Sequence, residues 1–344
     1  MQVHYYTTNI PFQYPFTISG GRTKTHQPAL VVVLQLGNLM GVGEAPAITY
    51  YNVSVEGMMA TLEAKKKMLE KFAFTTPERW WHFLHHLLPN DPFLVCALDM
   101  AGWDLFGKMR GKLLRDLWPA GKPPGPATNY TIGIDPLEVM VSKMKAHPWP
   151  IYKVKVGTDQ DVERLTALRA NTDAAIRIDA NGGWSLQQTL DILPTLEKLN
   201  IELVEQPLAK DNLKDMEKVR AATRLPLIAD ESCVSEHDVK KVAPYFTGIN
   251  IKLTKCSGPT PALRMIKEAR ELGLSVMMGC MNENVIGTAA LVNFLPQLDQ
   301  VDMDGPLLQT DANAAGLAIT AEGMGEVHGK AGLGIAVNLP KEMR

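Results

Sequence analysis

Short apolar segments alternate with longer amphipathic segments from about residue 130 to about residue 304. The apolar segments are YTIGI, YKVKVG, IRIDAN, ELVEQP, LIADES, INIKLT, VMMGC and VDMDGP, and their key polar residues stand at 155, 179, 205, 230, 252, 280 and 302. The intervening segments have helical character, as in SLQQTLDILPTLEKLN, where Ser185 and Gln188 form a capping-box pattern. A strand and a helix alternating in this way, with eight strands, predict a parallel (β/α) barrel over residues 119–324.

The first third of the chain has a different pattern. ALVVVLQLG (Ala29 to Gly37) followed by MGVGEAPA indicates a hairpin of two strands. Residues 54–88 are expected to be helical, and DPFLVCALDMAGWDLFGKMRGK carries a helical apolar stripe. The proline- and glycine-rich segment 119–129 is typical of a domain boundary. Residues 1–118 are therefore expected to form an α+β domain.

Composition narrows the class of protein. The chain has 344 residues, of which 46% are apolar and 21% charged, and its net charge of -2 offers no general attraction to nucleic acid or an anionic membrane. Its four cysteines contain no Cys-x-x-Cys pair, which argues against a disulfide framework or a zinc site. Without a signal-peptide pattern or a membrane-spanning apolar run, a soluble cytoplasmic protein is expected, and a homo-oligomer is left open.

Three carboxylates stand at the ends of consecutive predicted strands, namely Asp179, Glu205 and Asp230. A single acid in such a place is often only a helix N-cap. Three acids at one mouth of a closed barrel would repel one another by about 4 kcal/mol per pair at an effective dielectric of 20. A divalent cation relieves this repulsion, and a set of carboxylate oxygens favours Mg²⁺. Asn181 and Glu231 neighbour two of these ligands and are expected to support them.

Three lysines accompany the acids. Lys153 and Lys155 alternate along the second barrel strand and therefore share a face, and Lys252 ends the sixth strand across the barrel. A lone lysine on a strand is usually exposed, but the barrel frame directs these lysines to the active-site mouth. An ammonium group beside a metal ion and a second ammonium is disfavoured, so a lysine there can act as a base near neutral pH.

This set of groups indicates a class of reaction. A metal ion holding a carboxylate can stabilise the enolate that forms when the adjacent carbon loses its proton. With Lys155 and Lys252 as bases on opposite sides of that carbon, a proton can leave one face and return to the other. We therefore expect a two-base 1,1-proton transfer whose product is the epimer, with Lys153 tuning Lys155 and helping to bind the substrate.

The same residues resemble the enolase superfamily, and in particular its muconate-lactonizing subgroup. The resemblance lies in the Lys-x-Lys strand (Lys153-Val-Lys155), the three metal-ligand positions and Lys252 on the sixth strand. It extends over nearly the whole chain, through VCALDMAGWDLFGK, IRIDANGGW, LVEQP and AGLGI. It implies a modified (β/α)8 TIM barrel with an N-terminal α+β capping domain, onto which residues 325–344 pack back.

The eighth strand narrows the resemblance to one group of enzymes. Asp302-Met-Asp304 resembles the Asp-x-Asp pair with which dipeptide epimerases bind the α-ammonium group of their substrate. The alternative for such a pair is a polar strand end or a helix cap. The resemblance implies an isomerase that inverts the C-terminal residue of an L,L-dipeptide with Mg²⁺ as cofactor.

The resemblance also implies further substrate-binding residues. Arg22, assisted by Lys24, would pair with a carboxylate on the far side chain, which makes L-Ala-L-Glu the candidate substrate. Thr131, Cys280 and Asn282 match positions that line the substrate site, although Cys280 and Asn282 differ from the residues expected in an L-Ala-L-Glu epimerase.

Other functions remain open from the sequence. Within the subgroup they are N-acylamino acid racemase, o-succinylbenzoate synthase and muconate cycloisomerase, none of which needs a free substrate amine. From another enzyme class, a barrel lysine can form a Schiff base, as in a metal-free aldolase. A barrel that binds a ligand without catalysis is a third alternative.

Overall fold

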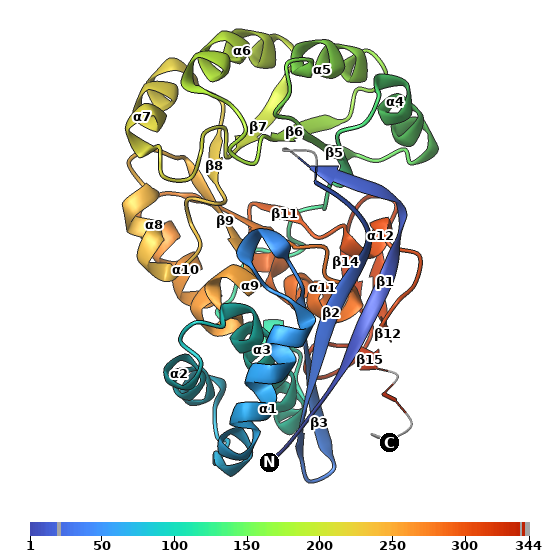
Figure 1. Cartoon of the computed structure of the whole chain (residues 1–344), viewed down its shortest axis with the longest axis vertical. Helices are drawn as coiled ribbons and strands as arrows, with labels where there is room; N and C mark the ends of the chain where they lie inside the picture. Colours follow the sequence, from blue (N-terminus) through green and yellow to red (C-terminus); the bar gives the residue numbers. More distant parts are fainter. Residues whose placement is uncertain (19–21, 338, 341–344) are drawn as a thin grey trace.

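The computed structural model of the protein describes residues 1–18, 22–337 and 339–340. It has two parts, an N-terminal antiparallel sheet with helices and a parallel barrel surrounded by helices (Figure 1). The antiparallel sheet extends toward one mouth of the barrel (Figure 1). The predicted TIM barrel with an N-terminal α+β capping domain is confirmed, and the N-terminal part is called the cap below.

The cap sheet has three strands in the order β1-β2-β3, which are β1 (Gln2–Ile18), β2 (Arg22–Leu36) and β3 (Leu39–Pro46). The predicted hairpin is β2–β3, and it turns at Gly37, whose φ of 60° suits a residue without a Cβ. The sequence pattern did not indicate β1. This strand pairs antiparallel with β2 along its length, with a register shift between Pro11 and Phe16.

Three helices complete the cap, α1 (Val55–Lys71), α2 (Pro77–Leu87) and α3 (Pro92–Arg110). The helical segment expected at 54–88 is thus two helices. The break occurs because Thr76 caps α2 with its side chain and Pro77 opens it, and proline is well suited to a first helical turn. Helix α3 packs closely on β3, where a Cβ on Gly43 would lie 2.0 Å from the Ala97 carbonyl oxygen.

Eight parallel strands form the barrel in sequence order. They are β4 (Tyr130–Ile132), β5 (Ile151–Lys155), β6 (Ala175–Asp179), β7 (Ile201–Glu205), β8 (Leu227–Ala229), β9 (Gly248–Lys252), β10 (Ser275–Gly279) and β11 (Gln300–Asp302). A bridge between Thr128, just before β4, and Val301 of β11 brings the two edges of the sheet together. The strand ends predicted to carry polar residues therefore meet at one mouth.

Helices follow the barrel strands. They are α4 (Leu137–Ala146), α5 (Asp161–Arg169), α6 (Leu186–Lys198), α7 (Leu213–Ala222), α8 (Glu236–Val242), α9 (Leu253–Cys256), α10 (Pro259–Glu271), α11 (Val285–Phe294) and α12 (Gly305–Leu308). The capping box at the start of α6 is confirmed, since the Gln188 N–H donates to Ser185 Oγ and the Ser185 N–H donates to Gln188 Oε1. Short elements complete the chain: η2 (Thr49–Tyr51), η3 (Leu114–Asp116), η4 (Leu295–Gln297), β12 (Ala314–Ala315), β13 (Leu317–Ile319), β14 (Gly325–Val327) and β15 (Ala336–Val337).

The C-terminal segment contacts the end of α3. The Leu333 N–H donates to Asp104 of α3, and the Leu114 N–H donates to the Gly332 carbonyl. Residues 338 and 341–344 of the segment predicted to pack onto the cap lie outside the described residues. Among the residues described, no helix combines the length and the apolar character needed to cross a membrane.

Candidate active site

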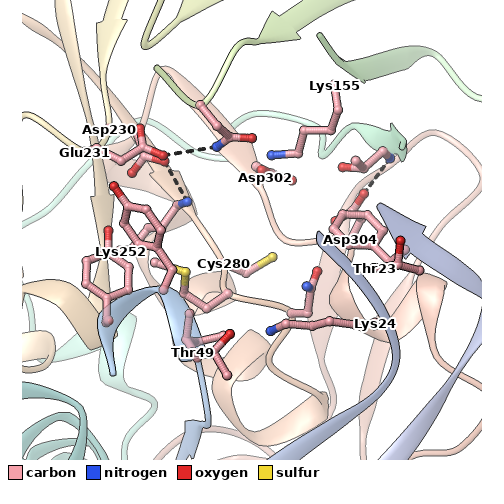
Figure 2. Close-up of a pocket in the computed structure, with 18 residues that line it drawn as sticks. Thr23, Lys24, Thr49, Lys155, Asp230, Glu231, Lys252, Cys280, Asp302 and Asp304 are labelled. Carbon is pink, nitrogen blue, oxygen red and sulfur yellow. Dashed lines mark hydrogen bonds and ion pairs between the residues drawn. The ribbon is translucent and has the colours of Figure 1, made fainter. Parts of the chain in front are cut away.

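A cavity of about 290 Å³ opens at the mouth of the barrel, between the strand ends and the cap. The cap contributes Phe16, Thr23 and Lys24 from the β1–β2 hairpin, and residues 48–51 from the segment that follows β3. The barrel contributes residues from several strand ends, which Figure 2 shows directed into the cavity. Such a concave site between two domains, with a few converging polar groups, is typical of a small-molecule site.

The three predicted metal ligands lie together. Asp179 ends β6, Glu205 ends β7 and Asp230 follows β8, and each is at most 1% exposed. One oxygen from each carboxylate lies within 4.8 Å of the others. Glu205 Oε2 lies 2.7 Å from Lys153 Nζ in an ion pair. Three buried carboxylates whose oxygens lie this close together fit a hard divalent cation.

Lys153 lies among these acids rather than at the open mouth. Its side chain is 1% exposed, and its Nζ lies 2.7 Å from Glu205, 2.7 Å from Asp302 and 3.1 Å from Asp179. Burial alone would lower the pKa of Lys153, but the three carboxylates raise it well above its ordinary value. Lys153 therefore stays protonated and balances the charge of the acids.

Lys155 and Lys252 both line the cavity, from different sides (Figure 2). Lys155 ends β5 and Lys252 ends β9, and the sheet order places β6, β7 and β8 between them. Four strand steps around an eight-stranded barrel separate residues on opposite walls. Lys155 Nζ lies 2.6 Å from Asp179, and Lys252 Nζ lies 2.8 Å from Asp230. Each lysine is thus ion-paired to a different member of the acid cluster.

The pKa of Lys252 is shifted in the direction opposite to the sequence-based expectation, which was that the ammonium form of a lysine in this site is disfavoured. Burial lowers its pKa, but Asp230 and Glu205 outweigh burial and raise the pKa well above the ordinary value. The acids respond in two ways. Burial alone would raise the pKa values of Asp179 and Asp230, but the nearby lysines have the larger effect and bring both values below the ordinary one. Burial and the Asp179 charge raise the pKa of Glu205 to about 7.

Asn181 and Glu231 lie beside the acids, as the sequence predicted. The Asn181 N–H donates to Asp179 Oδ1 at 2.9 Å, and Asn181 Nδ2 donates to Glu231 Oε1 at 3.1 Å. Burial, followed by the charge of Asp230, raises the pKa of Glu231 to about 7. The pair joins the strand ends that carry Asp179 and Asp230.

Sequence reasoning missed three further polar residues that hold the acids. Lys255 donates to Asp230 Oδ1 at 2.5 Å and to its carbonyl at 2.6 Å, and Asn250 Nδ2 donates to Glu205 Oε1 at 2.8 Å. Asn129 Nδ2 donates to Asp302 Oδ1 at 2.8 Å. The period of two in strands could have indicated Asn250, because it stands two residues before Lys252 and so faces the same way.

The predicted ammonium-binding pair lies at the end of β11. Asp302 is held by Lys153 and Asn129, and Asp304 Oδ2 accepts a hydrogen bond from the Thr131 N–H at 2.6 Å. Burial, followed by the charge of Asp302, raises the pKa of Asp304 to about 7. Cys280 Sγ and one oxygen of each aspartate lie within 4.8 Å of one another. The two acids and the thiol therefore form one wall of the cavity.

The remaining predicted substrate-binding residues differ in position. Thr131, Cys280 and Asn282 line the cavity together with Asp302 and Asp304. The side chain of Arg22 lies outside the described residues, so its predicted contact stays a prediction. Its neighbour Lys24 lines the cavity, and the Lys24 Nζ donates to Gln27 Oε1 at 3.4 Å.

Relatives of known activity have similar sequences. The chain is 45% identical to the L-Ala-D/L-amino acid epimerase of Maribacter sp. over 98% of this chain and 100% of that protein. It is 35% identical to the L-Ala-D/L-Glu epimerase of Bacteroides thetaiotaomicron over 93% of this chain and 84% of that protein.

Solved structures of epimerases are similar to this structure over nearly the whole chain. The dipeptide epimerase of Cytophaga hutchinsonii, complexed with Mg and the dipeptide D-Ala-L-Val, has a TM-score of 0.93 at 28% identity and covers 99% of this chain and 96% of that chain. The substrate-liganded L-Ala-D/L-Glu epimerase of Bacillus subtilis has a TM-score of 0.92 at 27% identity, covering 98% and 99%. Residues 138–341 match the family model described as enolase C-terminal domain-like. The chain therefore belongs to the enolase C-terminal domain-like family of the enolase superfamily, among its epimerases and racemases.

Proposed function

We propose that the protein is a Mg²⁺-dependent dipeptide epimerase that inverts the α-carbon of the C-terminal residue of an L,L-dipeptide. One observation carries the proposal: two lysines from opposite walls of the barrel enter one cavity, beside a cluster of three buried carboxylates. The relatives named above as dipeptide epimerases support it.

The metal would be held by Asp179, Glu205 and Asp230. The burial of their oxygens, and their mutual approach within 4.8 Å, support this assignment. When bound, Mg²⁺ would supply positive charge to the substrate carboxylate and to the enolate that forms from it. Lys255 and Asn250 would orient the carboxylates of Asp230 and Glu205 by the hydrogen bonds that they donate.

The two lysines would move the proton. Lys155 or Lys252, in its neutral form, takes the α-proton from one face of the carbon. The other lysine, as an ammonium group, returns a proton to the opposite face, so the configuration inverts. Lys155 is ion-paired with Asp179 and Lys252 with Asp230, and the charge of Asp230 raises the pKa of Lys252. Neutralisation of Asp230 by a cation would therefore make the neutral form of Lys252 more accessible.

Asp302 and Asp304 would bind the ammonium group of the dipeptide, while Lys153 assists at the carboxylate end chiefly by balancing the acids. Both aspartates are buried and line the cavity, which supports this role, and Lys153 already balances part of the charge of Asp302. The cap would contact the second side chain. Lys24 supports an anionic residue there, and L-Ala-L-Glu remains our candidate substrate, with Arg22 as a second cationic partner.

An isotope experiment tests the proposed function. L,L-dipeptides are incubated with the enzyme and Mg²⁺ in D₂O, and each epimer is analysed for deuterium at the α-carbon of its second residue. We expect one deuterium in the L,D product and loss of activity on chelation, restored by Mg²⁺. N-acetylated dipeptides serve as the control, since they lack the ammonium group. Turnover of acetylated and free dipeptides at equal rates would favour an N-acylamino acid racemase instead, and borohydride trapping of a substrate adduct would favour a Schiff-base enzyme.

A further inference from the structure

Glu44 reaches from the cap into the barrel. It lies on β3 and is 1% exposed, yet its partners belong to the start of the barrel helix α11. Glu44 Oε1 accepts from the Asn284 N–H at 3.0 Å, and Oε2 accepts from the Gly287 N–H at 2.9 Å. The first N–H groups of a helix have no partner within the helix, and the helix dipole favours an anion there. A carboxylate of one domain thus anchors a helix of the other.

The segment anchored in this way forms part of the cavity wall. Residues 280–284 connect β10 to α11, and we call them the 280–284 loop. Cys280, Met281 and Asn282 line the cavity. Asn282 adopts a positive φ of 64°, a left-handed conformation that asparagine enters more readily than most other residues. The shape of this wall therefore depends on what holds the loop.

Glu44 and Gln309 are two of the groups that hold the 280–284 loop. Glu44 fixes its C-terminal end from the cap. Gln309, which follows α12, donates to the Asn282 carbonyl at 2.7 Å and accepts from Asn284 Nδ2 at 2.5 Å. Gln309 is bridged to Phe12 of the cap strand β1, so Glu44 provides the direct contact of the cap with the start of α11 and Gln309 an indirect one.

The start of α11 packs against two buried acids, Glu44 and Glu283. Glu283 is also buried, and its Oε2 accepts from the Met281 N–H at 2.5 Å. A Cβ on Gly287 would lie 2.5 Å from the Cβ of Glu283 and 3.4 Å from Glu44 Oε2. The absence of a side chain at 287 therefore makes room for Glu283, and Glu44 Oε2 stays in contact with the same turn of α11.

We propose that Glu44 is a positioning residue that sets the selectivity of the enzyme for the first residue of its substrate by fixing the 280–284 loop. This inference rests on the proposed function, in which Asp302 and Asp304 receive the substrate ammonium group. Cys280 Sγ lies within 4.8 Å of their oxygens, so the side chain beside the ammonium faces this loop. Lys155 and the metal ligands stand on strands β5 to β7 and directly after β8, whereas Lys252 ends β9 and pairs in register with Gly279, just before the loop. An effect on proton transfer would act on both substrates, so the ratio of their kcat/KM values isolates the effect of Glu44 on selectivity.

The test compares Glu44→Gln with Asp99→Asn. Asp99 is a matched control because it too is a buried cap carboxylate that accepts from the start of a barrel helix, here the Thr260 N–H of α10 at 2.8 Å. The kcat/KM is measured for L-Ala and L-Leu dipeptides that share the same second residue. We expect the ratio of the two values to move several-fold toward one in Glu44→Gln and to stay at the wild-type value in Asp99→Asn. Glu44→Asp keeps the carboxylate on a shorter side chain, so its ratio should lie between those of the wild type and Glu44→Gln.

Hydrogen exchange provides a readout that does not need the proposed substrate. Peptides covering residues 279–287 should exchange faster in Glu44→Gln than in the wild type, with no change in Asp99→Asn. An active Glu44→Gln enzyme with an unchanged ratio overturns the inference, as does unchanged exchange in this peptide. If Glu44→Gln does not fold, the kcat/KM ratio and the hydrogen exchange of Glu44→Asp take its place as the test of the inference. A wild type that turns over neither dipeptide refutes the proposed function, and the exchange result then still decides whether Glu44 anchors the loop.

Discussion

Buried charge dominates the site at the scale of single residues. Lys153 contacts carboxylates that belong to both ends of the proposed substrate site, Glu205 on the metal side and Asp302 on the ammonium side. Breaking a buried pair by removing one partner typically costs about 3–5 kcal/mol, because the other charge stays buried. Asp304 is a better position for substitution than Asp302, because it makes no ion pair with Lys153 among the described contacts.

Asp304→Asn should weaken substrate binding with little effect on folding. The asparagine oxygen can still accept from the Thr131 N–H, whereas the charge opposite the substrate ammonium is lost. We expect KM for free dipeptides to rise by at least about tenfold, which corresponds to about 1.4 kcal/mol. Steady-state kinetics measure the change, and circular dichroism controls for folding. A KM equal to that of the wild type would show that Asp304 does not bind the ammonium group.

Contacts between elements fix the cap on the barrel. Asp99 of α3 accepts hydrogen bonds from the main chain and the hydroxyl of Thr260 at the start of α10. Gly258, with a φ of 124°, makes this approach feasible, because a Cβ there would lie 2.5 Å from Asp99 Oδ2. Glu44 makes the corresponding contact with α11. Two helices of the barrel part, α10 and α11, are thus tied to the cap by buried acids.

The protonation of Asp99 should give the stability of the protein a measurable pH dependence. Burial raises its pKa to about 8 against the lowering effect of the Thr260 hydrogen bonds and Arg264, with Glu78 adding a smaller raising effect. The folded state then holds a proton that the unfolded state releases near its ordinary value of 3.8. The contribution of Asp99 to the free energy of unfolding therefore decreases as the pH rises between these two values.

Asp99→Asn removes this titration. The melting temperature of the variant minus that of the wild type should increase from about pH 5 to about pH 8, whatever its sign at the lower pH. Differential scanning calorimetry across this range measures the difference. A difference that is constant with pH would show that Asp99 does not hold its proton in the folded protein.

At the scale of the whole molecule, the barrel could be predicted from sequence more fully than the cap. Each barrel strand carries its polar residue at the same end, and the recurring distance between these residues is itself a signal of the fold. Asp179, Glu205 and Asp230 could therefore be brought together without a structure. Strand β1 has no such repeat, and its pairing with β2 is a long-range contact that local pattern does not encode.

The contacts that cross between the cap and the barrel were the least predictable part. Glu44 and Asn284 are 240 residues apart in the chain, and Lys255 looks like one more lysine in a helix until its partner Asp230 is known. Glu44 and Lys255 belong to charged residue types that are usually exposed, so residue type alone would place both at the surface. Only the packed structure shows which charged residues are buried and what pairs with them.

The central claim is that Lys155 and Lys252 act on opposite faces of one carbon. The most direct test is exchange of the α-proton with D₂O in Lys155→Ala and Lys252→Ala, each supplied with Mg²⁺ and separately with the L,L- and L,D-dipeptide, and followed by ¹H NMR. Neither variant should epimerise. Each should exchange the proton of one epimer only, and the two variants should act on different epimers, because each keeps the base on one face. Epimerisation by either variant at the wild-type rate, or exchange of the same single epimer by both, would contradict the two-base account.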